Sequence, residues 1–156
     1  NMLSLFGSDS RNARFVLFAN TAITQSEYLE SDVPGVVGNN VEFVPAVNLK
    51  TGLSFGYKNI VGSFQHTFVS SQYTDASNAE QNVNDNQSGV RGEIPAYSVS
   101  DLSLSWSYKS LTLESGINNL FDTRYFTRRA TGYPGPGIIP SPPRTYYATI
   151  QLSFGR

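Results

Sequence analysis

Strict alternation of apolar and polar residues over long segments is the feature that most constrains this chain of 156 residues. Between Val41 and Tyr57 the odd positions are mostly apolar or aromatic, whereas the even positions from 48 onward hold Asn, Lys, Ser and Gly. The segment "LSLSWSY" at 102–108 repeats the pattern, and so does the segment from Tyr146 to Phe154. A period of two residues is typical of a β-strand with one apolar and one polar face. We therefore predict an all-β, antiparallel fold without helices.

Weaker versions of the alternation mark four further segments. The predicted strands, seven in all, cover residues 2–6, 13–28, 41–57, 60–73, 97–108, 111–126 and 146–154. The connections between them alternate strictly between short turns (7–12, 58–59, 109–110) and long loops (29–40, 74–95 and the proline-rich segment before residue 146). Outer-membrane barrels have short periplasmic turns and long external loops, so this rhythm favours a transmembrane β-barrel over a soluble sandwich.

Strand length supports the membrane interpretation. The chain contains no apolar run near the roughly 18 residues of a membrane helix, and its mean hydropathy of -0.26 is what alternating barrel strands average to. Tyr97 to Tyr108 spans about 36 Å along the strand, or about 25 Å vertically at a tilt near 45°, which matches the lipid-facing band of such barrels. A soluble lipocalin-like binding barrel is the alternative, but predicted strands of about 14 to 17 residues are long for it.

Several residues bear on the placement of the two faces. Lys50, Asp101 and Glu114 occupy the alternating positions that form the polar face, which we call the polar parity. A membrane barrel requires this, because a basic side chain on the lipid face near the midplane costs about 2 to 4 kcal/mol. His66 falls on the apolar parity, which indicates a local register change. Pro45 is awkward inside a ladder and indicates a bulge or the rim of the sheet.

Composition and motifs exclude several function classes. The net charge of -1 gives no sign of a nucleic-acid partner. The chain lacks cysteine, a Gly-rich phosphate loop, a G-x-S-x-G elbow and an H-E-x-x-H helix, and its single histidine is on the apolar parity, so we expect no enzymatic activity. We also expect no metal or cofactor held by protein ligands. Seven strands left open in lipid would expose two unpaired edges, so the chain is interpreted as the C-terminal piece of a larger barrel.

The segment "SGINNLFDTRYFTRRATGYPGPGIIPSPPRTYYATIQLSF", residues 115–154, resembles the C-terminal end of TonB-dependent outer-membrane receptors. An Asn-Leu-Phe-Asp strand leads there into the last external loop and a final Arg-x-x-Tyr strand. The Arg-Arg and Tyr-Pro-Gly-Pro-Gly-Ile continuation is similar to the ferric citrate (ferric dicitrate) branch of ferric-siderophore receptors. The resemblance implies a barrel of 22 strands around an N-terminal plug, in the outer membrane of a Gram-negative bacterium. Residues 1–156 would then be a C-terminal part of that barrel, with the plug and the first strands outside this chain.

The proline-rich external loop carries the candidate ligand-binding residues Arg128, Arg129, Tyr133 and Arg144. Arginine presents forked donors that suit carboxylate oxygens, so these residues are complementary to an anionic ferric citrate complex. In that case iron arrives as a chelated substrate, and replacing Arg128 and Arg129 by alanine weakens binding. The alternative is that these arginines pair with Asp122 or with lipopolysaccharide phosphates at the rim.

The resemblance implies partners that this chain does not contain. They are the rest of the barrel, the plug, the TonB complex that the plug contacts, the outer-membrane lipid with its lipopolysaccharide, and a ferric siderophore. A passive porin or a purely structural outer-membrane barrel is the competing function. An upstream plug domain would separate the two.

Overall fold

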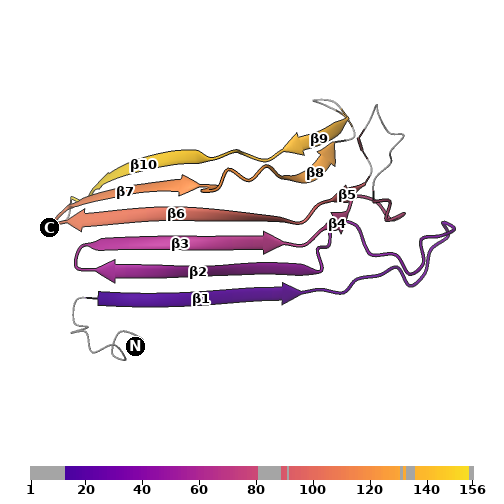
Figure 1. Ribbon diagram of the computed structural model, residues 1–156, viewed down its shortest axis with the longest axis horizontal. Coiled ribbons are helices and arrows are strands. Elements are labelled where there is room, and N and C mark those ends of the chain that lie inside the picture. The colour runs from indigo at the N-terminus through magenta and orange to yellow at the C-terminus, as the bar shows by residue number, and fades with distance from the viewer. Residues whose placement is uncertain (1–12, 81–88, 91, 131, 133–135, 155–156) are drawn as a thin grey trace.

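The computed structural model describes residues 13–80, 89–90, 92–130, 132 and 136–154. Six strands form one antiparallel sheet in the order β1-β2-β3-β6-β7-β10 (Figure 1), and two pairs of short strands lie in the loops. The sheet strands are β1 (Ala13–Ile23), β2 (Val47–Tyr57), β3 (Ile60–Val69), β6 (Tyr97–Tyr108), β7 (Leu111–Asn118) and β10 (Thr145–Leu152). The loop pairs are β4 (Gln72–Tyr73) with β5 (Glu93–Ile94), and β8 (Phe126–Ala130) with β9 (Gly137–Pro140).

Tight turns and long loops lie at opposite ends of this sheet (Figure 1). The two-residue turns at 58–59 and 109–110 begin with Lys58 and Lys109, whose φ angles of 51° and 52° suit the turns that join two twisted strands. Each lysine ammonium lies over the ring of the preceding tyrosine, at 5.3 Å for Tyr57 and 5.4 Å for Tyr108. All three long connections emerge at the other end. The described residues thus confirm the predicted alternation of short turns and long loops.

The register keeps the apolar residues of neighbouring strands side by side. One row across five strands consists of Tyr57, Ile60, Trp106, Leu113 and Ile150. These side chains have no protein layer over them: Ile60 is 47% exposed and Ile150 is 72% exposed. Among the described residues, the buried apolar side chains are Val36, Val69 and Ile94, which is no core for a soluble domain. The apolar face therefore requires an apolar environment outside the chain.

The relative positions of the tight turns at 58–59 and 109–110 give the tilt of the strands in a closed barrel. The pair Tyr57 and Ile60 ends the β2–β3 ladder, and Ile60 faces Trp106 on β6. The β6–β7 ladder runs two residues further, to Tyr108 and Leu111. The two turns are two strands apart, so with both turns at one level of the barrel each strand is offset from its neighbour by one residue. At a rise of about 3.3 Å per residue and about 4.8 Å between strands, this offset corresponds to a strand tilt of roughly 35°. That value lies within the range of transmembrane barrels.

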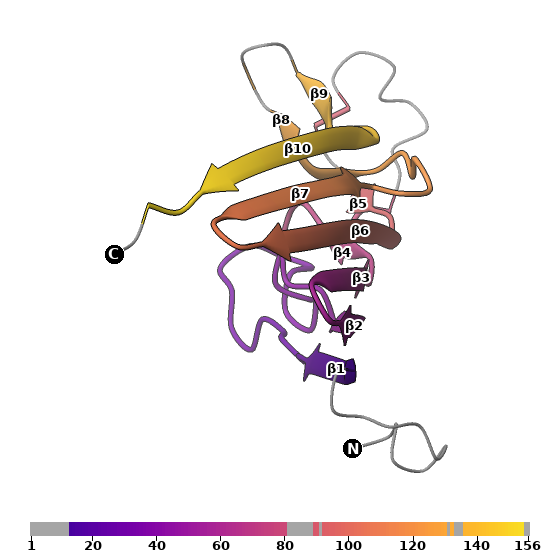
Figure 2. The ribbon, with the colours of Figure 1, turned by 90° about the vertical axis from the view of Figure 1, so that its left-hand side faces the viewer.

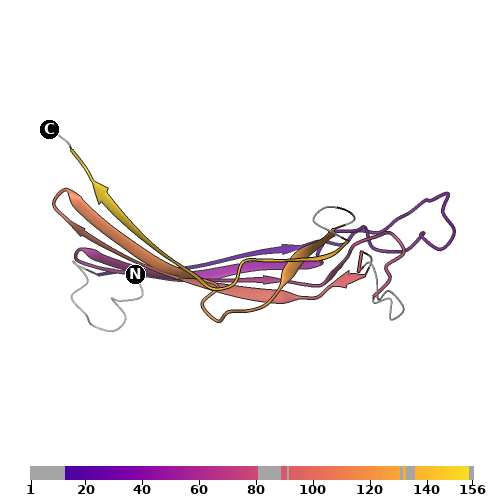
Figure 3. The same ribbon diagram turned by 90° about the horizontal axis from the view of Figure 1, so that it is seen from above.

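The sheet is curved rather than flat (Figure 3), and its edges are β1 and β10 (Figure 2). Within the described residues, neither edge strand has a partner on its outer side. No helix of the described part is long and apolar enough to cross a membrane.

The strands near the loop end are shorter than predicted. The predicted strand from Val41 begins only at Val47, because Phe43 has a φ angle of 58°, outside the extended range. Pro45 consequently lies at the rim and not in the ladder, as one of the two predictions for it stated. Similarly, β7 ends at Asn118 because Asn119 adopts a φ angle of 52°. The predicted strand at residues 2–6 lies outside the described residues.

The prediction of a register change at His66 is wrong. The β2–β3 and β3–β6 ladders run without interruption through His66, which pairs with Thr51 on one side and Ser100 on the other. The ring nitrogen Nδ1 of His66 lies 2.8 Å from the Ser100 hydroxyl, at hydrogen-bond distance. A polar residue is tolerated on the apolar face because a neighbouring strand supplies a hydrogen-bond partner.

Candidate functional site

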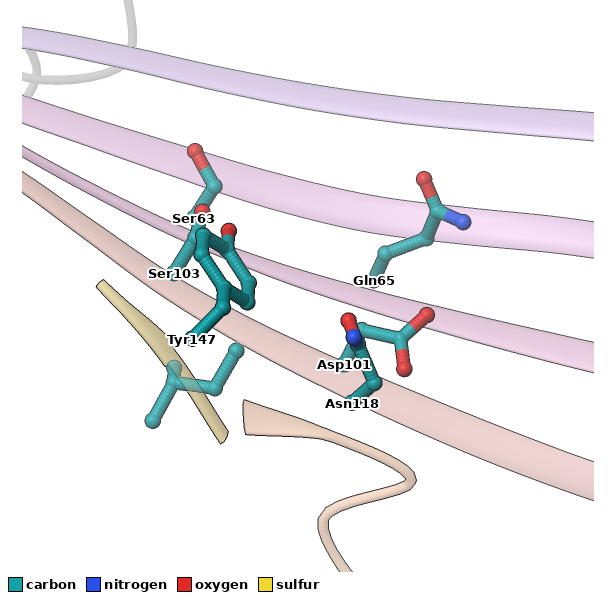
Figure 4. Close-up of a pocket in the computed structure, with 7 residues that line it drawn as sticks. Ser63, Gln65, Asp101, Ser103, Asn118 and Tyr147 are labelled. Carbon is teal, nitrogen blue, oxygen red and sulfur yellow. The ribbon is translucent and has the colours of Figure 1, made fainter. Parts of the chain in front are cut away.

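Polar side chains of the central strands lie together on the face opposite the apolar one (Figure 4). A hollow of about 170 Å³ is lined there mainly by polar residues, namely Ser63, Gln65, Asp101, Ser103, Asn118 and Tyr147. In a barrel, the polar face is the wall of the lumen. The hollow offers hydroxyl, amide and carboxylate groups, which suit hydrogen bonding to a polar ligand. Among the described residues, no group of three or more His, Cys, Asp or Glu side chains is placed to hold a metal.

Glycine on a neighbouring strand positions the tyrosine of this wall. Gly116 on β7 pairs with Tyr147 on β10, and a Cβ atom at Gly116 would lie 2.4 Å from the Tyr147 ring. Only glycine leaves the ring room to lie flat across the strand. The Tyr147 hydroxyl then donates to the Glu114 carboxylate at 3.3 Å. The wall is thus a fixed surface of donors and acceptors.

Asn119 organises the point where the chain leaves the sheet for the last long loop. Its side chain is buried, donates to the carbonyl of Thr123 at 2.9 Å and accepts the Thr123 N–H at 2.8 Å. Its backbone N–H donates to Asp101 Oδ1 at 2.9 Å. The left-handed conformation that it adopts is one that asparagine tolerates better than most residues. The "NLFD" segment is therefore a compact turn and not the predicted continuation of a strand.

The four predicted ligand-binding residues have different surroundings. Arg128 is exposed on β8, and Tyr133 lies outside the described residues. Arg144 is exposed just before β10, where its backbone N–H donates to Asp122 Oδ1 at 2.9 Å. This contact uses the backbone of Arg144 and not its guanidinium, so the alternative pairing of an arginine side chain with Asp122 stays a prediction. No described contact brings Arg144 to Arg128 or Arg129.

Arg129 joins two loops. Its guanidinium donates to the carbonyl of Gly89 at 2.9 Å and to that of Glu93 at 2.9 Å, and it lies 5.2 Å from the centre of the Phe126 ring. A Cβ atom at Gly92 would lie 3.3 Å from this guanidinium, and the φ angle of Gly92 is 135°, so glycine is needed there on both counts. The Arg129 guanidinium, which we predicted to bind a ligand, therefore connects β8 to the second long loop.

A second set of contacts joins the first long loop to the second. The Asn40 N–H donates to the Asn78 side-chain oxygen at 2.7 Å, and the Asn78 side-chain nitrogen donates to the Asn40 carbonyl at 2.9 Å. Asn39 donates to the carbonyl of Ala76 at 2.8 Å. The three long loops are thus connected through their described residues, and we call the described residues within 24–46, 70–94 and 126–140 the loop network. No sequence signal singled out these pairings.

One ionisable group in the first long loop is perturbed. The Tyr28 hydroxyl donates to Glu42 Oε2 at 2.6 Å. This hydrogen bond, followed by burial and by the negative charge of Glu42, raises the pKa of Tyr28 above its ordinary value near 10.0. The contact closes the first loop on itself between its two arms.

The fold is similar to that of several solved transporters and uptake receptors. The structure of the ferric citrate transporter FecA in its unliganded form matches with a TM-score of 0.79 and 27% identity over 90% of this chain and 21% of that one. The ferric yersiniabactin uptake receptor FyuA from Yersinia pestis matches with a TM-score of 0.70, 20% identity and coverage of 94% and 22%. The copper transporter OprC matches with a TM-score of 0.66, 17% identity and coverage of 94% and 22%. The chain spans about a fifth of the length of each of these proteins.

The family model described as TonB dependent receptor-like, beta-barrel, matches residues 4–120. This range is three quarters of the chain and includes the part upstream of residue 115, where only the rhythm of strands and loops indicated the family. The open antiparallel sheet, its bare apolar face and its alternating turns agree with a fragment of such a barrel. The chain belongs to the TonB-dependent receptor β-barrel family.

Proposed function

We propose that this chain is part of an outer-membrane receptor that imports a ferric chelate with energy from the TonB complex. The observation that supports this most directly is the match of residues 4–120 to the receptor barrel family. On this proposal the unpaired edges of β1 and β10 continue into the rest of a barrel of 22 strands, with a plug against the polar wall. The apolar face then contacts outer-membrane lipid and lipopolysaccharide in a Gram-negative bacterium.

We infer further that the cargo is a siderophore-type chelate, with ferric citrate as the first candidate. FecA, a ferric citrate transporter, matches with 27% identity, and the third loop of this chain carries arginines suited to carboxylates. Exposed Arg128 and Arg144 remain candidates for ligand contact, together with Tyr133. Arg129 is assigned to the loop network because its guanidinium donates to two backbone carbonyls. Iron enters as cargo, and the chain supplies no catalytic group.

The test is uptake of ⁵⁵Fe-labelled ferric citrate by cells that carry the full-length protein in which this segment occurs. Uptake that requires TonB supports the proposal, and uptake that persists without TonB favours the passive porin. The double replacement of Arg128 and Arg144 by alanine should weaken binding about tenfold or more, as expected when hydrogen bonds from charged donors are lost. Arg14→Ala is the matched control, because Arg14 is exposed near the turn end of β1. Saturable uptake of a different metal chelate would retain the receptor but change the cargo.

A further inference from the structure

A cleft of about 270 Å³ lies at the loop end of the sheet, where β7 departs from β6. The β6–β7 ladder stops at Leu102 and Ile117, and the Leu120 N–H still donates to the Ser100 carbonyl at 2.7 Å. Beyond Ser100, residues 123–126 face the edge of β6 in place of a strand. The cleft lies between these two segments and is lined by Pro95, Ala96, Tyr97, Ser98, Thr123, Arg124, Tyr125 and Phe126.

One wall of this cleft is aromatic. The rings of Tyr97 and Tyr125 stack with their centroids 4.6 Å apart and their planes 25° apart. Tyr97 has the polar parity of β6, the same as Asp101 and Ser103, so it belongs to the lumen side of the sheet and not to the lipid face. The stacked pair is half-buried and joins two segments that no ladder connects.

The charge of the cleft has one sign. Of the eight described residues that line it, Arg124 alone is charged, and its side chain is exposed. Arg129 adds a second cation close by, over the Phe126 ring at 5.2 Å, although its guanidinium is held by the second loop. A rigid aromatic wall beside an unburied guanidinium is complementary to a flat group that carries negative charge on oxygen.

We propose that this rim cleft (Tyr97, Arg124, Tyr125 and Phe126) binds one planar oxyanion arm of the chelate, either a carboxylate or a phenolate. The inference rests on the proposed function and adds a contact site beyond Arg128, Tyr133 and Arg144. Sites for drug-sized ligands usually measure about 300 to 1,000 Å³, so a cleft of this size holds an arm and not a whole chelate. Arg124 binds the charged oxygens of either arm, and the tyrosine pair packs against the flat face of a phenolate ring.

The experiment measures the Kd of the purified full-length protein for two probes, ferric dicitrate and a ferric tris-catecholate complex. The variants are Arg124→Gln, Tyr125→Leu and Tyr125→Phe, with Arg14→Gln at the other end of the sheet as the control. Resistance to trypsin in detergent shows that each variant is folded. Tyr125→Phe preserves the ring, so a loss that Tyr125→Leu alone shows reports ring stacking, and Arg124→Gln still tests the cleft if Tyr125→Leu fails to fold.

We expect Arg124→Gln to weaken binding of the preferred probe about tenfold or more, while Arg14→Gln leaves it unchanged. If the arm is a phenolate, Tyr125→Leu should lower the affinity about fivefold and Tyr125→Phe should not. If the arm is a carboxylate, both tyrosine variants should bind within about twofold of the parent. Equal affinities of the parent and Arg124→Gln for the bound probe would overturn the rim cleft and leave the receptor function intact. A parent that binds neither probe would overturn a carboxylate or catecholate cargo, and the rim cleft with it, whereas the receptor function is tested separately by TonB-dependent uptake.

Discussion

The six-stranded sheet and the loop network are held together in different ways. In the sheet the backbone carries the structure: β1 and β2 alone share eleven consecutive residue pairs. In the loops, single side chains donate to backbone carbonyls of other loops, as Arg129 does to Gly89 and Glu93. The comparison teaches that the sheet depends on a pattern of residue types, whereas the loops depend on particular residues.

The two regions should accordingly differ in what they tolerate. Apart from positions such as Gly116, where a side chain would clash, a sheet position accepts residues with the correct face preference, because its hydrogen bonds come from the main chain. A loop position such as Asn78 both donates and accepts through its amide, so few residues can replace it. Substitutions that respect parity should be mild in the sheet, and conservative substitutions should be costly in the loops.

Reversal of parity in the sheet should have the largest effect. Leu104 is in the middle of β6 on the apolar face, so Leu104→Arg places a charge in lipid and should cost about 2 to 4 kcal/mol. The measurement is the amount of heat-resistant, folded protein in the outer membrane, which should fall sharply. Ser105→Arg is the matched control, because Ser105 is the next residue on the same strand and has the opposite parity. Equal losses from both variants would contradict the assignment of the faces.

The turn at Asn119 should be the most sensitive point where the loops meet the sheet. Asn119→Ala removes the contacts to Thr123 and places alanine at a φ angle of 52°, so we expect a loss of about 2 to 3 kcal/mol. Asn118→Ala is the neighbouring control, because the Asn118 side chain is exposed and makes only a bond of 3.3 Å to Thr145. Urea-induced unfolding in lipid vesicles gives both values. A loss at Asn118 as large as that at Asn119 would show that the turn is not special.

The strands of the sheet were predictable because the alternation of apolar and polar residues that specifies them recurs at every second residue. The prediction for β6 was correct to the residue, and the turn rhythm placed all three long loops at one end. The strand ends were predicted too long, since Phe43 and Asn119 leave the extended conformation at single positions that alternation does not report. The rule for polar residues on the apolar face also failed at His66, because its partner, Ser100, is distant in sequence.

The candidate site was less predictable because its contacts join residues far apart in the chain. The sequence shows that Arg129 is basic, but not that Gly89 and Glu93 present carbonyls to it from 36 to 40 positions away. The stacking of Tyr97 on Tyr125 has the same origin. A loop side chain can bind a ligand or bind another loop, and residue type alone does not distinguish the two.

Loss of the Arg129 hydrogen bonds between the second and third long loops should have a smaller and more local effect on stability. Arg129→Gln loses two hydrogen bonds from a charged donor, and we expect about 1.5 kcal/mol, the low end of the usual range because the side chain is half-buried. Hydrogen exchange at residues 89–94 should become about tenfold faster while exchange in β6 stays the same. Arg128→Gln, an exposed neighbour with the same charge, is the control. Faster exchange throughout the sheet would mean that the loop network also supports the barrel.

The smallest expected effect is a change with pH inside the first loop. The hydrogen bond to Glu42 raises the pKa of Tyr28, so the contact is fully present below the ordinary tyrosine pKa near 10 and is lost as pH rises through the raised value. The difference in absorbance at 295 nm between the parent and Tyr28→Phe should therefore titrate above pH 10. Glu42→Gln removes the negative charge and should return this titration toward pH 10. Because both residues lie outside the six strands of the sheet, hydrogen exchange in the strands should not change over the same pH range. Faster strand exchange in step with the Tyr28 titration would show that the two regions are not separable.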